Sequence, residues 1–326
     1  MRKLRFCFIL FLFASILNCN SFAQEKAAVP AKNSTYAPAV FTSLFDGKTL
    51  SGWTGIPETA WTVKDSAIAM TGDNRGVIYT NGTYRTYRII FSVRQIKGID
   101  HWPCVLVFGP DPKLDALGAV QFQLPKGYTW DYRPGKNNDG RAYFTHLGKI
   151  PDVNKTDWAR CEILVDAATG TARSAAAQPI GSPAVEVLDF KDASIANIPA
   201  PFGLQSHNKG QFDEYKDIMI EVDPKVNELL TVLAPPTNLT VEAKSGKEID
   251  LTWTDNSAVE DGFKVERSTD NLNWKTIAIV PLNTTSYSDK RLALKSSYYY
   301  RISAFNTVVS SAYTFANGTT DLAKKQ

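Results

Sequence analysis

The feature that most constrains the fold is a long series of short strand-like stretches, with almost no helical pattern between them. Between residues 41 and 222, apolar stretches recur and are separated by clusters of Gly, Pro, Asn and Asp. No apolar stripe of helical period extends beyond two turns. Many short strands with such turn signals indicate an all-β sandwich. The strands expected before residue 200 are 62–63, 77–79, 87–93, 105–108, 120–124, 160–165 and 185–190.

The clearest alternation lies near the end of this series. Apolar side chains occupy every second position from 218 to 222, which predicts a half-buried strand. Residues 203–207 predict a shorter strand that runs into a loop. We expect this loop to hold His207, Asp213 and Glu214 at the rim of a sheet, where polar groups can contact a ligand without being buried unpaired.

The N-terminus predicts export. Residues 1–5 are basic, residues 6–17 form an apolar run too short to span a membrane, and a small-residue cleavage site ends at Ala23. Residues 1–23 are therefore expected to be a signal peptide, and the protein to be periplasmic, displayed at the outer surface or secreted. Lipidation of Cys19 is the alternative. The Ala- and Pro-rich residues 24–40 predict a flexible tether.

Charge gives no reason to expect a nucleic acid or a membrane surface as partner. The chain has 36 Lys and Arg and 33 Asp and Glu, and three of the basic residues lie in the leader. The mature protein is close to neutral, which disfavours polyanions as partners. A hydrophobic content of 44% suits globular domains with real cores.

Two cysteines remain once the leader is removed. Cys104 and Cys161 each lie in an apolar, strand-like run. Export permits a disulfide between them. Two buried free thiols are an equal alternative, because cysteine in a strand often packs as a small hydrophobic residue.

Several classes of chemistry have no motif in this chain. There is no H-E-x-x-H, no spaced Cys/His set, no Gly-rich phosphate loop and no G-x-S-x-G. The E-x-D-x-E alternation that would place two carboxylates on one strand face is also missing. Zinc proteases, nucleotide-binding enzymes, serine hydrolases and ordinary two-carboxylate glycosidases are therefore disfavoured.

A polar face and an aromatic loop suggest a sugar site instead. Gln121 and Gln123 are two apart on an expected strand, so both amides project from the same face and can hydrogen-bond to sugar hydroxyls. The loop at 129–141 follows and combines rings that can stack on a sugar with charged groups. Its candidate binding residues are Trp130, Asp131, Tyr132, Arg133 and Lys136.

Two motifs resemble a known family. LFDGKTLSGW at 44–53 and GLQSH at 203–207, with the closing strand after it, are similar to the opening and closing segments of the 3-keto-disaccharide hydrolase family. The resemblance spans about residues 41–223 and implies a concanavalin-like jelly roll. The chain departs from the family pattern in having Gln121 where Glu is usual, Lys216 in place of Arg, and no N-S-G segment.

The resemblance implies a particular reaction, the cleavage of a glycoside or a 3-keto-glycoside. His207 coincides with the His of the family's closing motif and is the candidate base, with Arg133 or Lys136 as the cation beside the ketone oxygen. Gln205 shares a face with His207, and Glu214 is a further binding candidate. A divalent metal such as Ca²⁺ or Mn²⁺ is compatible with this chemistry, although no ligands can be named.

A second module is expected after a linker at 224–234. The strands expected within 235–320 follow the order of a fibronectin type III domain, an immunoglobulin-like sandwich. Trp253 would fill its core, and Tyr298 with Leu294 upstream resembles the family's tyrosine corner. Such modules are usually spacers or adhesion units, which implies a cell-surface partner.

The sequence thus predicts an exported all-β protein with two sandwiches, a saccharide as partner and no transmembrane segment. The leading function is cleavage of a glycosidic bond. The alternative is a non-catalytic carbohydrate-binding or adhesion protein that uses the same face, and Gln121 in place of a carboxylate favours it.

Overall fold

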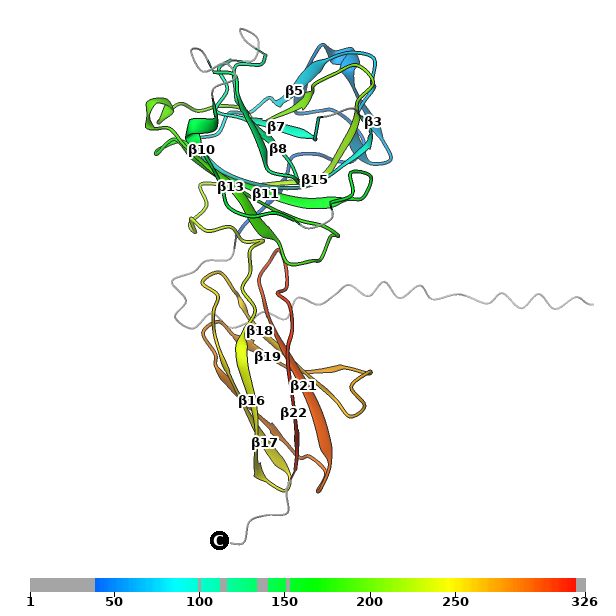
Figure 1. The fold of residues 1–326 in the computed structure, drawn as a ribbon, viewed down its shortest axis with the longest axis vertical. Coiled ribbons are helices and arrows are strands. Elements are labelled where there is room, and N and C mark those ends of the chain that lie inside the picture. Colours follow the sequence, from blue (N-terminus) through cyan, green and yellow to red (C-terminus); the bar gives the residue numbers. More distant parts are fainter. Residues whose placement is uncertain (1–38, 99–100, 112–115, 134–139, 151–152, 321–326) are drawn as a thin grey trace, which may run out of the picture. The chain divides into compact units, whose positions relative to one another are not determined.

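The computed structural model describes residues 39–98, 101–111, 116–133, 140–150 and 153–320, almost entirely as antiparallel strands (Figure 1). The expected all-β fold is confirmed, as a jelly-roll sandwich followed by a second β-sandwich. The leader and nearly all of the expected tether lie outside the described residues. In the described part, no helix is long and apolar enough to cross a membrane.

The first sandwich pairs a nine-stranded sheet with a six-stranded sheet, called here the large sheet and the small sheet. The large sheet has the order β10-β13-β12-β11-β6-β15-β4-β3, with β1 paired to β15. Its strands are β1 (Thr42–Ser43), β3 (Trp61–Lys64), β4 (Ala67–Met70), β6 (Thr86–Lys97), β10 (Phe144–His146), β11 (Ala159–Asp166), β12 (Thr171–Ala177), β13 (Val185–Lys191) and β15 (Phe212–Val222).

The small sheet has the order β2-β5-β14-β7-β8-β9. Its strands are β2 (Trp53–Ile56), β5 (Gly76–Thr80), β7 (Cys104–Val107), β8 (Val120–Gln123), β9 (Tyr128–Asp131) and β14 (Gly203–Ser206). Short 3₁₀ turns occur at Glu58–Ala60, Gly140–Tyr143 and Ala193–Ile195.

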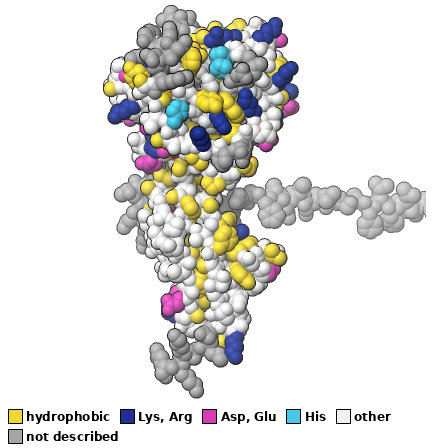
Figure 2. All heavy atoms as spheres, in the orientation of Figure 1, with side chains coloured by type: hydrophobic (Ala, Val, Ile, Leu, Met, Phe, Trp, Pro, Cys, Tyr) yellow, Lys and Arg dark blue, Asp and Glu magenta, His cyan; other side chains and the backbone are white. Residues whose placement is uncertain are grey.

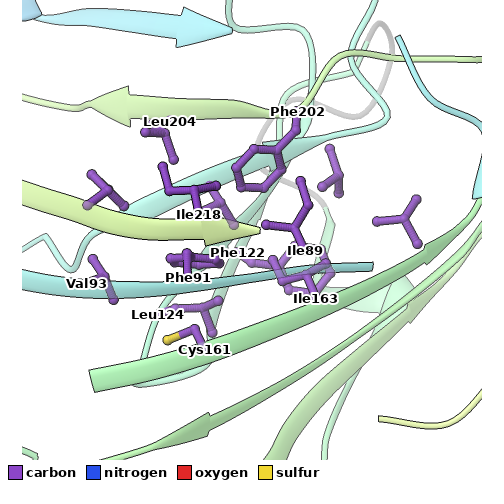
Figure 3. Close-up of a cluster of buried hydrophobic side chains, with 14 of the residues drawn as sticks. Ile89, Phe91, Val93, Phe122, Leu124, Cys161, Ile163, Phe202, Leu204 and Ile218 are labelled. Carbon is purple, nitrogen blue, oxygen red and sulfur yellow. The ribbon is translucent and has the colours of Figure 1, made fainter. Parts of the chain in front are cut away.

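The core lies between the two sheets and follows the period-two alternation (Figure 3). Ile89, Phe91 and Val93 of β6 point inward and meet Phe122 and Leu204 of the small sheet. Burying side chains of this size stabilises the fold by about 1.5–3 kcal/mol each. Because side chains alternate along a strand, the residues between these inward ones must point to the outer faces of the sheets.

The two cysteines lie on different sheets, Cys161 on β11 of the large sheet and Cys104 on β7 of the small sheet. Cys161 packs in the core between the sheets, whereas Cys104 is paired with Gln205 and Gln123 and faces outward with them. Both are buried free thiols, so the disulfide alternative is not realised. Burial raises the pKa of each thiol, which leaves both protonated at neutral pH.

The second sandwich consists of a three-stranded and a four-stranded sheet. Trp253 is buried in its core against Phe263, with ring centroids 5.7 Å apart. Its strands are β16 (Thr237–Ser245), β17 (Glu248–Thr254) and β20 (Ser286–Lys290) in one sheet, and β18 (Gly262–Ser268), β19 (Lys275–Pro281), β21 (Ser297–Phe305) and β22 (Thr314–Thr319) in the other.

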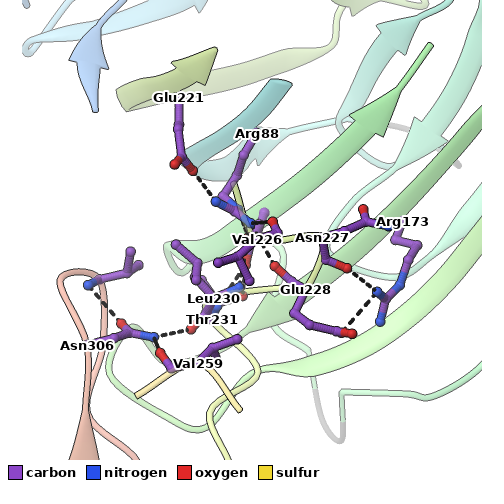
Figure 4. A network of polar contacts seen from close by, with 12 residues as sticks. Arg88, Arg173, Glu221, Val226, Asn227, Glu228, Leu230, Thr231, Val259 and Asn306 are labelled. Carbon is purple, nitrogen blue, oxygen red and sulfur yellow. Dashed lines mark hydrogen bonds and ion pairs between the residues drawn. The ribbon is translucent and has the colours of Figure 1, made fainter. Parts of the chain in front are cut away.

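The expected linker, residues 224–234, is bonded to the first sandwich; residues 224–228 are exposed or half-buried, whereas Leu229, Leu230, Thr231 and Leu233 are buried (Figure 4). Both carboxylate oxygens of Glu162 accept backbone hydrogen bonds, from Leu230 N at 3.0 Å and from Thr231 N at 2.7 Å. Arg88 forms an ion pair with Glu162 at 2.7 Å and donates to the carbonyl oxygen of Glu228 at 2.7 Å. Leu230 also belongs to the hydrophobic core of the second sandwich.

Candidate functional site

The outer face of the small sheet carries the residues that the sequence analysis singled out. Because Leu204, Val105 and Phe122 point into the core, their neighbours along each strand point outward. The strand register aligns the outward residues in two rows. One row runs Tyr79, Gly203, Leu106, Gln121 and Trp130, and the other runs Val77, Gln205, Cys104, Gln123 and Tyr128.

Three glutamines form a hydrogen-bonded group at the centre of this face. Gln121 Nε2 donates to Gln205 Oε1, and Gln123 Nε2 lies 3.3 Å from Gln121 Oε1. Gln121 and Gln205 have no exposed surface, and Gln205 Nε2 makes no well-formed hydrogen bond, although the Gln205 side chain lies near enough to the Tyr132 hydroxyl to lower its pKa. A buried donor without a partner costs about 1–3 kcal/mol, so this amide is set up to bind something.

Two histidines extend the glutamine group. The rings of His101 and His207 are stacked, with centroids 3.5 Å apart and an interplanar angle of 14°. Gln123 Nε2 lies 3.3 Å from His101 Nδ1, which links the stack to the amides. Figure 2 shows histidine side chains at the surface of the first sandwich, beside hydrophobic and basic side chains. His207 is thus linked to Gln123 through His101, and Gln121 and Gln123 lie beside each other on β8.

The environment keeps His207 unprotonated. Burial lowers the pKa of its imidazole to about 4, and the neighbouring His101 and Arg75 act in the same direction, against the smaller opposing effect of a hydrogen bond with Asn208. Its Nδ1 atom is buried without a hydrogen-bond partner. At neutral pH the ring is therefore a neutral group that is able to accept a proton.

The aromatic residues predicted for sugar binding flank the glutamines. Trp130 is paired with Gln121, and its ring centroid lies 5.8 Å from that of Tyr132. Both residues are half-buried, and Trp130 Nε1 has no partner. Burial, and secondarily Cys104, raises the pKa of the Tyr132 hydroxyl, which therefore stays protonated and can donate a hydrogen bond. We call Gln121, Gln123, Gln205, His101, His207, Trp130 and Tyr132 the amide–histidine cluster.

Arg75 supplies the positive charge near this cluster, and the sequence analysis missed it. Its side chain is exposed, and its charge lowers the pKa values of both His207 and the Tyr132 hydroxyl. A signal was present in the sequence. Arg75 is two residues before Val77, an outward residue of β5, and period-two alternation directs both to the same face.

Arg133 and Asp131 do not join the amide–histidine cluster, which corrects the expectation for this loop. Residues 128–131 form β9, and Asp131 is paired with the core residue Val120, on the side opposite to Trp130. Arg133 donates to Asp131 Oδ2 at 2.7 Å and to Asp192 Oδ2 at 2.9 Å. Although burial lowers the pKa of Arg133, these two carboxylates raise it overall. This ion-paired arginine belongs to the framework. Lys136 lies outside the described residues.

Asp213 and Glu214 are also placed differently from the prediction, because both lie within β15 instead of a loop. Glu214 faces outward from the large sheet and pairs with Arg94 at 2.7 Å. Asp213 has no exposed surface and accepts hydrogen bonds from Gln95 at 2.8 Å and Gln211 at 2.5 Å. Glu214 is therefore not a substrate-binding residue of the small sheet.

Asp213 supports the histidine stack from behind. Gln95 Nε2, which donates to Asp213, also donates to the backbone oxygen of His101 at 2.7 Å. Burial raises the pKa of Asp213 to about 7, against the opposing effect of the two glutamine hydrogen bonds. Its position behind His101 could not be read from the sequence, because nothing local links the two residues.

No metal centre emerges from the described residues. Within them, no group of three or more His, Cys, Asp or Glu side chains is arranged to hold a metal ion. The groups that the described residues bring to the cluster are neutral amides, imidazoles and a phenol, with Arg75 beside them.

A sandwich domain with amides, imidazoles and aromatic rings on one sheet face suits a carbohydrate-active protein. The comparison with protein families identifies the family of this carbohydrate-active domain. Residues 40–221, more than half of the chain, match the 3-keto-alpha-glucoside-1,2-lyase-like domain, and the chain belongs to this family. No curated protein matches the chain.

Solved structures give weaker likenesses. A crystal structure of a candidate glycosyl hydrolase from Parabacteroides distasonis is 16% identical, covers 56% of this chain and 99% of its own, and has a TM-score of 0.40. A Fn3-like protein from Clostridium thermocellum is 29% identical over 29% of this chain and 97% of its own, with a TM-score of 0.24. The fn3 domain of human contactin 1 is 15% identical over 28% of this chain and 81% of its own, with a TM-score of 0.26.

Proposed function

We propose that the first sandwich cleaves the glycosidic bond of a 3-keto-glycoside by elimination, at the outer face of the small sheet. The observation that carries this proposal is His207. It is a neutral imidazole with an unpaired ring nitrogen, beside a buried amide donor, in a domain of the lyase-like family. Those features match the demands of proton removal next to a ketone.

The reaction follows from the acidity of a carbon next to a carbonyl group. A ketone at C3 acidifies the proton on C2, and a base removes that proton to give an enolate. The enolate electrons then form the C1–C2 double bond as the C1–O bond breaks, and the C3 carbonyl is restored. The departing oxygen takes up a proton, so the products are an unsaturated keto-sugar and an alcohol.

The cluster offers a group for each demand of this reaction. His207 is the proton acceptor, and its low pKa means that it is available throughout the physiological range but is only a weak base. Stabilisation of the enolate must therefore contribute much of the rate. Arg75 provides the positive charge, and Tyr132 and Gln205 provide hydrogen-bond donors near the developing oxyanion. Arg75 thus replaces Arg133 as the candidate cation.

The direct test is turnover of C3-oxidised maltose by the purified protein, with and without Mn²⁺ or Ca²⁺, followed as released glucose. We expect cleavage by the wild type, and a loss of about 10²–10⁴-fold in His207→Ala, the usual contribution of a positioned general base. His146→Ala is the matched control, because His146 is an exposed histidine of β10 on the other sheet. Equal rates for wild type and His207→Ala would contradict the proposal.

The second candidate function is carbohydrate binding without catalysis, on the same face. The observation that favours it is Gln121, a neutral amide already bonded to Gln205 where the family pattern places a carboxylate. Binding of maltose and its C3-oxidised form, with no release of glucose under any metal condition, would select this alternative.

We propose further that residues 235–320 form a fibronectin type III module and that the protein is exported. Support for the module comes from the three-plus-four strand arrangement, the buried Trp253 and a hydrogen bond from Ala293 N to the Tyr298 hydroxyl at 3.0 Å. Export rests on the N-terminal sequence alone. Intact-mass measurement of the protein after expression in a bacterial host tests it, and a mature chain that begins at Gln24 is expected. A surface partner for the module is the corresponding proposal for its role.

A further inference from the structure

A hollow lies on the same outer face of the small sheet as the amide–histidine cluster, at the end formed by β2 and β5. Its volume is about 540 Å³, within the range of small-molecule sites. Thr54, Ile56 and Tyr79 form its floor, and Asn81, Ile198 and Pro201 contribute to its walls. Nothing in the proposed reaction uses these residues.

The register relates this hollow to the amide–histidine cluster. Tyr79 and Gln121 lie in the same row and are separated by Gly203 and Leu106 on the two strands between them. Three strand spacings correspond to roughly 14 Å. A Cβ atom at Gly203 would lie 2.4 Å from the Tyr79 ring, so this ring leans across β14 toward the cluster. Between the two sites, Ala116 and Leu117 pack on Tyr79 and Leu106, so a short chain of sugar rings that joins the sites passes over this segment.

The lining of the hollow is chemically suited to an uncharged sugar. It combines hydroxyl and amide groups and the carboxylate of Asp111 with apolar proline and isoleucine surfaces, and it includes no lysine or arginine. Such a surface can hydrogen-bond to sugar hydroxyls and pack against the C–H faces of the ring, whereas it has no positive charge to attract an anion. The Thr54 hydroxyl donates to Asn81 Oδ1 at 2.6 Å and holds this amide in one orientation.

We propose that this hollow binds a neutral glucosyl unit on the leaving side of the substrate, beyond the bond that is broken at the amide–histidine cluster. The inference rests on the proposed function for the position of the broken bond, but not for the binding itself. The substrate would then be an oligosaccharide of at least three sugar units. Its oxidised end unit would bind at the amide–histidine cluster, and a unit farther along the chain would bind in the hollow.

The test is to fill the hollow and compare substrates of different length. Ile198 is 52% exposed at its wall, and Ile198→Trp would occupy the space of a sugar ring. Ile180→Trp is the matched control, because Ile180 is 50% exposed and is not part of the lining. For Ile198→Trp we expect kcat/KM to fall about tenfold or more with C3-oxidised maltotriose and to remain unchanged with C3-oxidised methyl α-glucoside. Ile180→Trp should match the wild type on both.

Calorimetric titration with unoxidised maltotriose separates this inference from the proposed reaction. If the wild type cleaves no keto-sugar, but Ile198→Trp loses the maltotriose binding that Ile180→Trp retains, the hollow is a sugar site and the proposed function fails. If the wild type cleaves both substrates and Ile198→Trp does so equally well, the hollow has no such role and the proposed function stands. Absence of maltotriose binding to the wild type, together with unchanged kinetics in Ile198→Trp, also overturns the inference.

Discussion

The outer faces of the two sheets in the first sandwich both bury polar side chains, but they do so in opposite ways. On the large sheet, Arg88 and Glu162 are fully buried charges, and their ion pair is completed by hydrogen bonds to residues 224–234. On the small sheet the buried groups are neutral, and donors such as Gln205 Nε2 and Trp130 Nε1 are left without partners.

The difference indicates which face is framework and which is available for a ligand. A buried charge is tolerated only when it is paired and hydrogen-bonded, and the large-sheet group meets this demand through the ion pair of Arg88 with Glu162 and the hydrogen bonds that Glu162 accepts from Leu230 N and Thr231 N. Unsaturated neutral donors cost less and can be completed when a ligand binds. The two faces therefore differ less in polarity or burial than in whether their buried polar atoms have partners within the protein.

The largest loss of folding stability is expected when one partner of the buried ion pair on the large sheet is removed. Glu162→Ala leaves the Arg88 guanidinium buried with less compensation and removes the acceptors of Leu230 N and Thr231 N. The expected loss is about 3–5 kcal/mol in the free energy of unfolding, measured by urea denaturation. Glu186→Ala is the control, because its ion pair with Arg173 is partly exposed and should contribute about 1 kcal/mol or less. Equal losses in the two variants would contradict the comparison.

The next largest effect is the pH dependence of stability that arises from the buried carboxyl group of Asp213. Because the pKa of Asp213 is raised to about 7 in the folded protein, from 3.8, the folded state binds this proton more tightly. The contribution of Asp213 to stability is therefore highest below pH 4, falls as the pH rises toward 7, and is lowest above 7. Asp213→Asn should remove this slope, measured by unfolding at a series of pH values. Glu214→Gln, one residue away on the opposite face, should retain it.

A smaller effect is expected from placing a charge on the unsaturated face. Gln121→Glu introduces the carboxylate of the family pattern at a position with no exposed surface. Burial should raise the pKa of this group and destabilise the fold by roughly 1–3 kcal/mol at pH 8, with recovery as the pH falls below the raised pKa. Gln178→Glu, at a hydrogen-bonded glutamine that is partly exposed, is the control. A stability of Gln121→Glu that does not depend on pH would argue that this face already accommodates charge.

The smallest change in stability is expected for His207→Ala, the variant in which we expect turnover to fall most. The His207 ring is only partly buried and its Nδ1 makes no hydrogen bond, so its removal should alter the free energy of unfolding by less than about 1 kcal/mol. Thermal unfolding measured beside the activity assay checks this. A loss as large as that of Glu162→Ala would make His207 part of the framework and remove the distinction between the two faces.

The fold could be predicted from sequence because turn residues punctuate its strands and because the inward residues are large. Strand β12 was missed because Thr171–Ala177 carries mainly small side chains, so its alternation leaves no hydrophobic signal. Strand β9 was taken for a loop because aromatic and charged residues follow one another there. That single error assigned Arg133 to the site together with Trp130, although the strand directs Asp131 and Trp130 to opposite faces.

The candidate site was predictable only where one strand contains its pattern. Gln121 and Gln123 were found by period-two alternation within β8, and the shared family motif drew attention to His207. His101 and Asp213 come together only through Gln95, across three separate segments of the chain. Contacts between segments that are far apart in the chain cannot be predicted from the local sequence pattern.

The segment bonded to Glu162 also bears on how the native protein opens. The N–H groups of Leu230 and Thr231 are tied to the first sandwich, while the Leu230 side chain is buried in the second core. Releasing either N–H group would uncover apolar surface and a buried carboxylate at once. These two amide hydrogens should therefore exchange with deuterium at the slow rate of global unfolding, and not at the rate typical of a segment that joins two domains.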